Sequence, residues 1–198
     1  MTAPSKTLTK TQLALQEYAN AGFRVFPVSG KTPIVKAWQK TEYVQRPKPE
    51  RFTLNFGIAL DSTHLIIDID PRNFALSDPR NPESLRVNSF DRLCDDLGLD
   101  LTLLCGFIVK TGSGGRHLYF RKKHDFLVRG GLRQYPGVEF KTAGQYVVGY
   151  GSIHPETKAE YVVVSGSPTQ LNDAPSVLLA AIQRKPYDFA TGNVKIEF

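Results

Sequence analysis

The segment Leu65-Ile66-Ile67-Asp68-Ile69-Asp70-Pro71 combines a short apolar run with two aspartates. Its length and its β-branched residues predict a buried strand that ends at Pro71. Because residues i and i+2 of a strand point to the same face, Asp68 and Asp70 project together, while Ile67 and Ile69 enter the opposite layer. Two such carboxylates repel unless a positive charge lies between them, and Mg²⁺ prefers oxygen ligands. The segment therefore predicts a core strand with a metal-binding end. A solvent-facing edge strand with acids for solubility is the alternative.

The segments on either side alternate between helical and strand patterns. Helices are predicted from a cap at Thr9 or Thr11 through Tyr18, from a cap at Asn81 through Leu97, and over residues 175–184. Strands are predicted over residues 23–28, 55–60, 64–69, 103–109, 116–120, 138–141, 145–148 and 161–164, with the second and third forming a hairpin. Residues 31–52 are rich in proline and lysine and predict a long loop. This order predicts an α+β fold with a mixed, largely antiparallel central sheet and flanking helices.

Composition excludes several classes of protein. With 198 residues and 41% hydrophobic side chains, the chain can bury a core, and no apolar run is long enough to cross a membrane. The two cysteines, Cys94 and Cys105, cannot form a disulfide framework, which favours a reducing compartment and hence the cytoplasm. The histidines lack the paired spacing of a structural zinc site. We expect one catalytic domain over residues 1–184, and a tail over residues 185–198 or the start of a linker to a further domain.

The positive charge is concentrated in one part of the chain. The net charge is +6, and a block from Lys110 to Lys141 contains eight bases against only Asp125 and Glu139. The bases are Lys110, Arg116, Arg121, Lys122, Lys123, Arg129, Arg133 and Lys141. Such a block suits a polyanion bound beside a cluster of carboxylates. A solvated basic face without a partner is the alternative.

Glu139 is an acid inside this basic block, in the predicted strand Gly137-Val138-Glu139-Phe140-Lys141. An acid in such a position either pairs with a neighbouring Arg or Lys or binds a metal ion. Both interpretations stay open at this point.

The segment Thr111-Gly112-Ser113-Gly114-Gly115-Arg116-His117 joins two predicted strands. Glycines permit positive φ and close backbone approach, so that successive N–H groups can converge on phosphate oxygens. The segment is not a nucleoside-triphosphate P-loop, which ends in Gly-Lys-Ser/Thr and continues as a helix. A tight glycine hairpin beside a surface histidine is the alternative interpretation.

Taken in order, these motifs resemble the N-terminal bifunctional primase-polymerase (prim-pol) domain of the archaeo-eukaryotic primase superfamily. The resemblance runs from Leu13 to Ile182. It rests on Gly22-Phe23-Arg24-Val25-Phe26-Pro27-Val28, Gly30-Lys31-Thr32-Pro33, Lys36-Ala37-Trp38, Asn55-Phe56-Gly57-Ile58-Ala59, the Asp68–Asp70 pair, the glycine turn with His117, Gly137 to Lys141, and Gly144-Gln145-Tyr146-Val147-Val148 ending at Ser152. It implies a prim-pol catalytic core related to the RRM fold.

The resemblance also implies roles for individual residues. Asp68, Asp70 and Glu139 would be catalytic acids that hold two Mg²⁺ or Mn²⁺ ions. The nucleotide would contact Lys31, Ser113, Gly114, Gly115, Arg116, His117 and Ser152, and the DNA backbone would contact Arg121, Lys122, Lys123, Arg129, Arg133 and Lys141. Two features depart from the family pattern. The third acid is Glu where the family usually has Asp, and Val148-Gly149-Tyr150-Gly151 precedes Ser152 where proline is commoner.

The implied function is template-dependent DNA polymerase and primase activity in replication of a plasmid, phage or other mobile element. The implied partners are a single-stranded template, a primer-template, deoxynucleoside or ribonucleoside triphosphates, and a helicase domain or subunit. A metal-dependent nuclease is one alternative, because Glu139-Phe140-Lys141 matches half of a restriction-type site. A non-catalytic single-strand-binding module is another. A rolling-circle nickase is disfavoured because the sequence contains no His-x-His.

Overall fold

The computed structural model describes residues 8–40 and 55–184. Its helices are α1 (Lys10–Asn20), α2 (Ser89–Leu97), α3 (Leu101–Leu104), α4 (Ser176–Ile182) and the 3₁₀ helix η3 (Pro71–Asn73). Its strands are β1 (Arg24–Ser29), β2 (Thr32–Pro33), β3 (Phe56–Ala59), β4 (His64–Ile69), β5 (Phe107–Lys110), β6 (Arg116–Arg121), β7 (Val138–Lys141), β8 (Tyr146–Val148), β9 (Val162–Gly166) and β10 (Asn172–Asp173). The predicted strand over residues 138–141 is confirmed at both ends.

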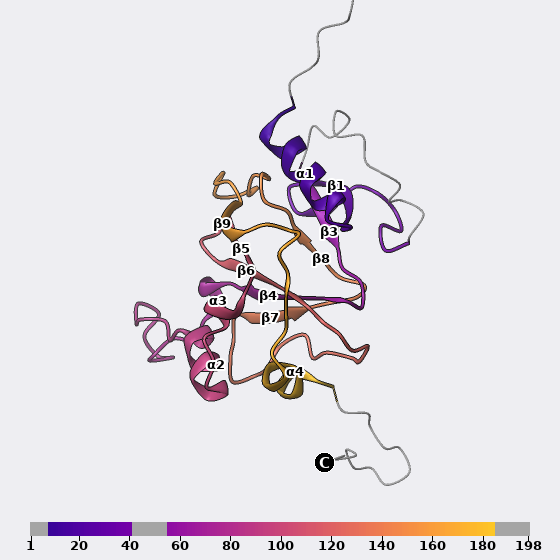
Figure 1. Cartoon of the computed structure of the whole chain (residues 1–198). Helices are drawn as coiled ribbons and strands as arrows, with labels where there is room; N and C mark the ends of the chain where they lie inside the picture. The colour runs from indigo at the N-terminus through magenta and orange to yellow at the C-terminus, as the bar shows by residue number, and fades with distance from the viewer. Residues whose placement is uncertain (1–7, 41–54, 185–198) are drawn as a thin grey trace, which may run out of the picture.

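The strands form two sheets (Figure 1). The larger sheet has the order β7-β4-β6-β5-β9, with β10 beside β6, and the smaller sheet has the order β2-β1-β3-β8. Every pairing between these strands is antiparallel except that of β10 with β6. The predicted α+β fold with a largely antiparallel sheet is therefore confirmed.

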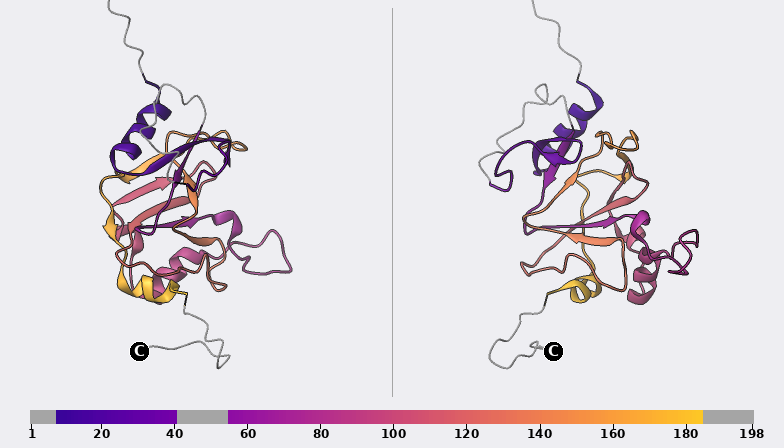
Figure 2. Two further views of the ribbon diagram at one scale, coloured as in Figure 1. Left: turned by 90° about the vertical axis from the view of Figure 1, so that its right-hand side faces the viewer. Right: turned by 180° about the vertical axis from the view of Figure 1, so that it is seen from behind.

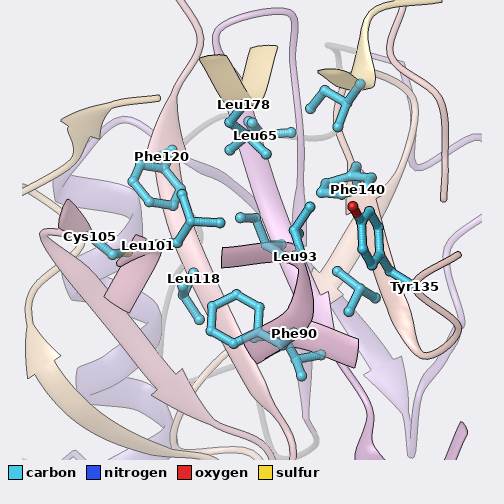
Figure 3. Packing of buried hydrophobic residues seen from close by; sticks show 14 of the residues in the cluster. Leu65, Phe90, Leu93, Leu101, Cys105, Leu118, Phe120, Tyr135, Phe140 and Leu178 are labelled. Atoms are coloured by element: carbon cyan, nitrogen blue, oxygen red, sulfur yellow. The ribbon is translucent and has the colours of Figure 1, made fainter. Parts of the chain in front are cut away.

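The larger sheet is covered on both faces. Successive side chains of β4 point alternately to these two faces. Leu65, Ile67 and Ile69 point to one face, where they pack in a cluster with residues of α2 and α4 (Figure 3). Ile66 points to the other face, into a cluster with α1 and strands of the smaller sheet. The views in Figure 2 show α1 and the smaller sheet on the side opposite α2 and α4. Because both faces of β4 are buried, its backbone is held firmly under the acids at its end.

Local capping chemistry sets the helix ends. The Thr9 side chain accepts a hydrogen bond from the Gln12 N–H, and the Gln12 side chain accepts one from the Thr9 N–H, which completes a capping box. Gly98 ends α2 with φ +63°, a conformation that glycine adopts without strain. Of the two predicted caps, Thr9 and Thr11, Thr9 is the one that begins α1, and the predicted stop at Gly98 is confirmed.

Three local predictions are wrong. Residues 55–60 and 64–69 are not a hairpin, because β3 pairs with β1 and β8 whereas β4 pairs with β6 and β7. Helix α2 begins after Asn88 rather than after Asn81, because the Asn88 side chain accepts from the N–H groups of Phe90 and Asp91. The predicted strand over residues 103–109 begins only at Phe107. Asp100 accepts from the N–H groups of Thr102 and Leu103 and starts the short helix α3 instead.

Some predictions concern residues outside the described ranges 8–40 and 55–184. Most of the predicted loop over residues 31–52 and the whole predicted tail over residues 185–198 lie outside the described residues. Within residues 8–40 and 55–184, no helix is long and apolar enough to cross a membrane.

Candidate active site

Three polar side chains form a row across the adjacent strands β7, β4 and β6 of the larger sheet. Asp68 in β4 lies directly opposite Glu139 in β7 and directly opposite His117 in β6. Directly opposed residues of antiparallel strands point to the same face, so one side chain from each of three adjacent strands enters the same space. This face is the one that carries Ile66 and Tyr119 and is turned toward the smaller sheet.

Asp68 is the centre of this row. Its Oδ1 lies 3.5 Å from His117 Nε2, and its Oδ2 lies 3.5 Å from Lys141 Nζ. Burial by itself raises the pKa of Asp68, but the charges and hydrogen bonds of His117 and Lys141 outweigh burial and hold that pKa below its usual value. Asp68 is therefore a carboxylate at neutral pH, ready to bind a cation.

Asp70 follows directly after β4 and caps η3. Its Oδ1 accepts from Arg72 Nε at 3.0 Å, and its Oδ2 accepts from Arg72 Nη2 at 2.8 Å. The side-chain hydrogen bonds of Arg72 lower the pKa of Asp70. Asp70 is thus a carboxylate in a two-point contact with an arginine, an interaction that the sequence analysis did not anticipate.

The glycine turn between β5 and β6 fits tightly against its surroundings. A Cβ at Gly115 would lie 2.0 Å from the Ile69 carbonyl oxygen, so only glycine lets the turn pass this close to the end of β4. A Cβ at Gly112 would lie 2.4 Å from His154 Cβ. Inside the turn, the hydroxyls of Thr111 and Ser113 lie 3.0 Å apart. The glycines thus bring Ser113 to the end of β4, beside the acids.

These elements surround a pocket of about 270 Å³, which we call the inter-sheet pocket. Its lining comes from both sheets, the glycine turn and the residue before β9. It consists of Lys31, Asp68, Asp70, Thr111, Ser113, His117, Lys141, Tyr146, Val147, Val148 and Tyr161. Carboxylates, hydroxyls, a histidine and two lysines therefore meet in one cavity, an arrangement suited to an anionic ligand together with a cation.

The family model for the N-terminal domain of bifunctional DNA primase/polymerases, Prim-Pol, matches residues 15–177 of the sequence. The chain belongs to the Prim-Pol family. The match spans every element of the inter-sheet pocket, and it confirms the resemblance found in the sequence. No curated protein shows a significant match to the chain.

Family membership settles the general activity. A Prim-Pol domain is a DNA primase/polymerase, a nucleotidyltransferase of DNA replication whose partners are DNA and nucleoside triphosphates. Prim-Pol nucleotidyltransferases generally use divalent metal ions. The inter-sheet pocket of this Prim-Pol domain is lined by Asp68, Asp70 and His117 and by Thr111 and Ser113 of the glycine turn, whereas Glu139 lies outside its lining.

The acids fit such an ion in their chemistry, although they do not form a complete ligand set. Among the described residues, no group of three His, Cys, Asp or Glu side chains lies close enough to hold a metal. Asp68 and Glu139 nevertheless share one cation already, the ammonium of Lys141. Oxygen donors arranged around a positive charge are what a hard divalent ion requires, so Asp68 and Glu139 could hold one, while Asp70 is paired with Arg72.

Several residues expected at the nucleotide lie elsewhere. Gly114, Gly115 and Arg116 line a neighbouring cavity beside Phe74 and Phe90 rather than the inter-sheet pocket. Ser152 is fully buried, and its Oγ accepts a hydrogen bond from the Phe56 N–H at 3.4 Å. Of the residues predicted to contact the nucleotide, the structure brings together Lys31, Ser113 and His117.

The predicted DNA contacts do not form one surface. Lys122 is 2% exposed, and its ammonium donates to the carbonyls of His124 and Phe126. Arg121 and Lys123 both pair with Asp173. Lys141 lies inside the inter-sheet pocket.

Of the residues predicted to contact the DNA backbone, only Arg129 and Arg133 are exposed and without an ion pair among the described residues. They flank Gly131, which bridges to Glu139 at the edge of β7. Arg129 and Arg133 therefore lie on the segment that borders β7 at Glu139.

The sequence analysis missed two residues around the pocket. Tyr161 lines the pocket and is 3% exposed, with His117 and His154 near its ring at centroid distances of 6.1 and 6.2 Å. His154 is fully buried; its Nδ1 accepts from the N–H groups of Glu156 and Thr157, and its Nε2 has no partner among the described residues. His154 lies two residues after Ser152, where one of the family-like motifs ends. This proximity was the signal in the sequence that could have identified His154.

Proposed function

We propose that the chain is a template-dependent DNA polymerase and primase that uses two divalent cations, Mg²⁺ or Mn²⁺, held by Asp68, Asp70 and Glu139. The observation that carries this proposal is the row of Glu139, Asp68 and His117 across β7, β4 and β6, with the inter-sheet pocket above it. Replication of a plasmid, phage or other mobile element in the cytoplasm, together with a helicase domain or subunit, belongs to the same proposal.

When bound, the cations would activate the 3′ hydroxyl of the primer and stabilise the charge of the leaving pyrophosphate. The residues of the chain then have separate tasks. Lys31 and Ser113 line the pocket and can donate to triphosphate oxygens. His117 lines the same pocket; its Nε2 faces Asp68, and its buried Nδ1 has no hydrogen-bond partner among the described residues.

Template and primer would enter from the β7 edge. The Glu139 side chain is 56% exposed there, and Arg129 and Arg133 lie on the adjoining segment. A phosphate backbone along this edge would meet two arginines and place a primer end beside the acids. Binding through these arginines should weaken as salt concentration rises.

One observation also favours a nuclease. Lys141 contacts both Asp68 and Glu139, and a restriction-type site combines such a lysine with two acids. That interpretation does not explain why Ser113, His117 and Lys31 line the same pocket. The polymerase proposal accounts for these three residues together with Asp68 and Glu139.

One assay separates the possibilities. A labelled primer annealed to a longer template, and the same template without a primer, would be incubated with Mg²⁺ or Mn²⁺ and either deoxynucleoside or ribonucleoside triphosphates. We expect lengthened primers with the wild-type chain and none with Asp68→Asn. The matched control is Asp95→Asn, on the exposed side of α2, which should behave as wild type. Shortened products would indicate a nuclease, and retention without any change in length would indicate a binding module.

A further inference from the structure

Lys141 holds the position that a metal ion would need. It follows Glu139 by two residues in β7, so both side chains point to the same face of the larger sheet. Its Nζ lies 2.5 Å from Glu139 Oε2 and 3.5 Å from Asp68 Oδ2. The lysine side chain is only 19% exposed, so the contact is held inside the inter-sheet pocket rather than on an open surface.

An ammonium and a divalent cation cannot both occupy this position. The N–H groups of Lys141 use the same carboxylate lone pairs that a metal ion would use. A second positive charge within a few ångströms of the first would also be repelled, and partial burial makes this repulsion stronger than in water. Lys141 has four rotatable methylenes, so its ammonium can leave the carboxylates while the backbone of β7 stays in place.

We propose that Lys141 is a resident counter-ion that neutralises Asp68 and Glu139 without metal and must be displaced when a divalent cation binds. Lys141 thereby sets the metal affinity of the site. This inference rests on the proposed function, because it takes these two acids as metal ligands. It gives Lys141 a positioning role in the pocket in place of a contact to the DNA backbone.

The test is the binding of Mn²⁺ to the free protein, measured by electron paramagnetic resonance from the loss of the free Mn²⁺ signal. We expect Lys141→Met to bind Mn²⁺ about ten-fold more tightly than wild type, because no resident cation competes. Lys141→Arg keeps the charge and should stay close to wild type. The matched control is Lys110→Met, an exposed lysine at the end of β5 whose removal should not change the affinity.

A second measurement checks the fold and the direction of the effect. Lys141→Met leaves two adjacent carboxylates without the ammonium, so Mn²⁺ should raise its melting temperature more than it raises that of wild type. The double variant Asp68→Asn with Lys141→Met should lose the tighter binding, which assigns the bound ion to this site.

The outcomes distinguish the inference from the proposed function. If Lys141→Met binds Mn²⁺ with unchanged or weaker affinity while wild type still extends primers, the counter-ion role is wrong and the polymerase stands. If no variant binds Mn²⁺, including Lys141→Met, the counter-ion role is wrong as well, because removing the competing cation should expose the site. If the protein binds Mn²⁺ but does not extend primers, the metal site stands and the proposed polymerase activity is wrong.

Discussion

Asp68 and His117 lie directly opposite each other on β4 and β6, with Asp68 Oδ1 3.5 Å from His117 Nε2. This contact links the acid expected at the metal to the histidine expected at the triphosphate. It also orients the imidazole, because Nε2 faces Asp68 while Nδ1 is buried without a hydrogen-bond partner among the described residues. A substitution of either residue should therefore affect both metal binding and triphosphate binding, and the two affinities can be measured separately.

Substitution of Asp68 should abolish primer extension and also destabilise the protein. A metal-binding pair of aspartates would by itself suggest relief of repulsion and higher stability. Here Asp68 is paired with Lys141 and His117, so Asp68→Asn leaves a half-buried ammonium with one partner fewer. We expect a loss of about 1–3 kcal/mol in the free energy of unfolding, measured by urea denaturation at pH 7. An equal or higher stability of Asp68→Asn would show that the ion pair contributes nothing.

The same residue should give the protein a characteristic acid sensitivity. The pKa of Asp68 is lowered in the folded state, so its contribution is present above the ordinary carboxyl pKa of about 4 and is lost as pH falls through the lowered value. Between about pH 4 and pH 2, wild type should lose more stability than Asp68→Asn. Parallel pH profiles of the two proteins in urea denaturation would contradict this assignment.

His117→Ala should weaken binding of a nucleoside triphosphate about ten-fold while changing single-stranded DNA affinity little. The physical reason is that His117 is 5% exposed and faces the pocket beside Ser113, away from the exposed arginines at the β7 edge. Fluorescent nucleotide titration and DNA anisotropy measure the two affinities. His124→Ala changes an exposed histidine and serves as the control. Equal losses for both ligands would show that His117 supports the fold rather than the nucleotide.

Gly112→Ala should disturb the glycine turn without unfolding the protein. The new Cβ would lie 2.4 Å from His154 Cβ and 2.6 Å from the Ala159 carbonyl oxygen, so the turn must move away from the segment that supports it. We expect weaker nucleotide binding through displacement of Ser113. Gly130→Ala is the control, because no atom lies within 4 Å of its added Cβ. Nucleotide affinity in Gly112→Ala at the level of that control would overturn the expectation.

The buried pair Tyr18 and Tyr119 should control alkaline stability. Their hydroxyls lie 3.0 Å apart between α1 and the larger sheet, and burial raises the pKa of both. Because the folded pKa values exceed the unfolded value of about 10, the stability they contribute is present below pH 10 and is lost as pH rises above it. Tyr18→Phe should cost about 1 kcal/mol at pH 7 and reduce the loss between pH 9 and 11. Urea denaturation at pH 7, 9 and 11 measures the free energy of unfolding of both proteins. An equal loss of stability between pH 9 and 11 in Tyr18→Phe and wild type would contradict this prediction.

The sequence by itself determined the local features of this protein. The alternation in β4, the bounds of β7, the cap at Thr9 and the stop at Gly98 all follow from interactions within a few residues, which a sequence records directly. It also identified Lys31, Asp68, Asp70, Ser113 and His117, which line one pocket. Residue type and spacing alone pointed to Asp68, Asp70, Ser113 and His117, whereas Lys31 was implied only by the resemblance to the prim-pol family.

Only the tertiary structure decided which residues meet. The register of β7, β4 and β6 places Asp68 opposite Glu139 and His117, and register depends on packing across both faces of the sheet rather than on any one strand. The same packing buries Lys122 against backbone carbonyls and turns Lys141 into the pocket, although the sequence presents both as members of one basic block. A charge in a sequence does not specify its surroundings, because the oxygens that surround a folded lysine come from segments far away along the chain.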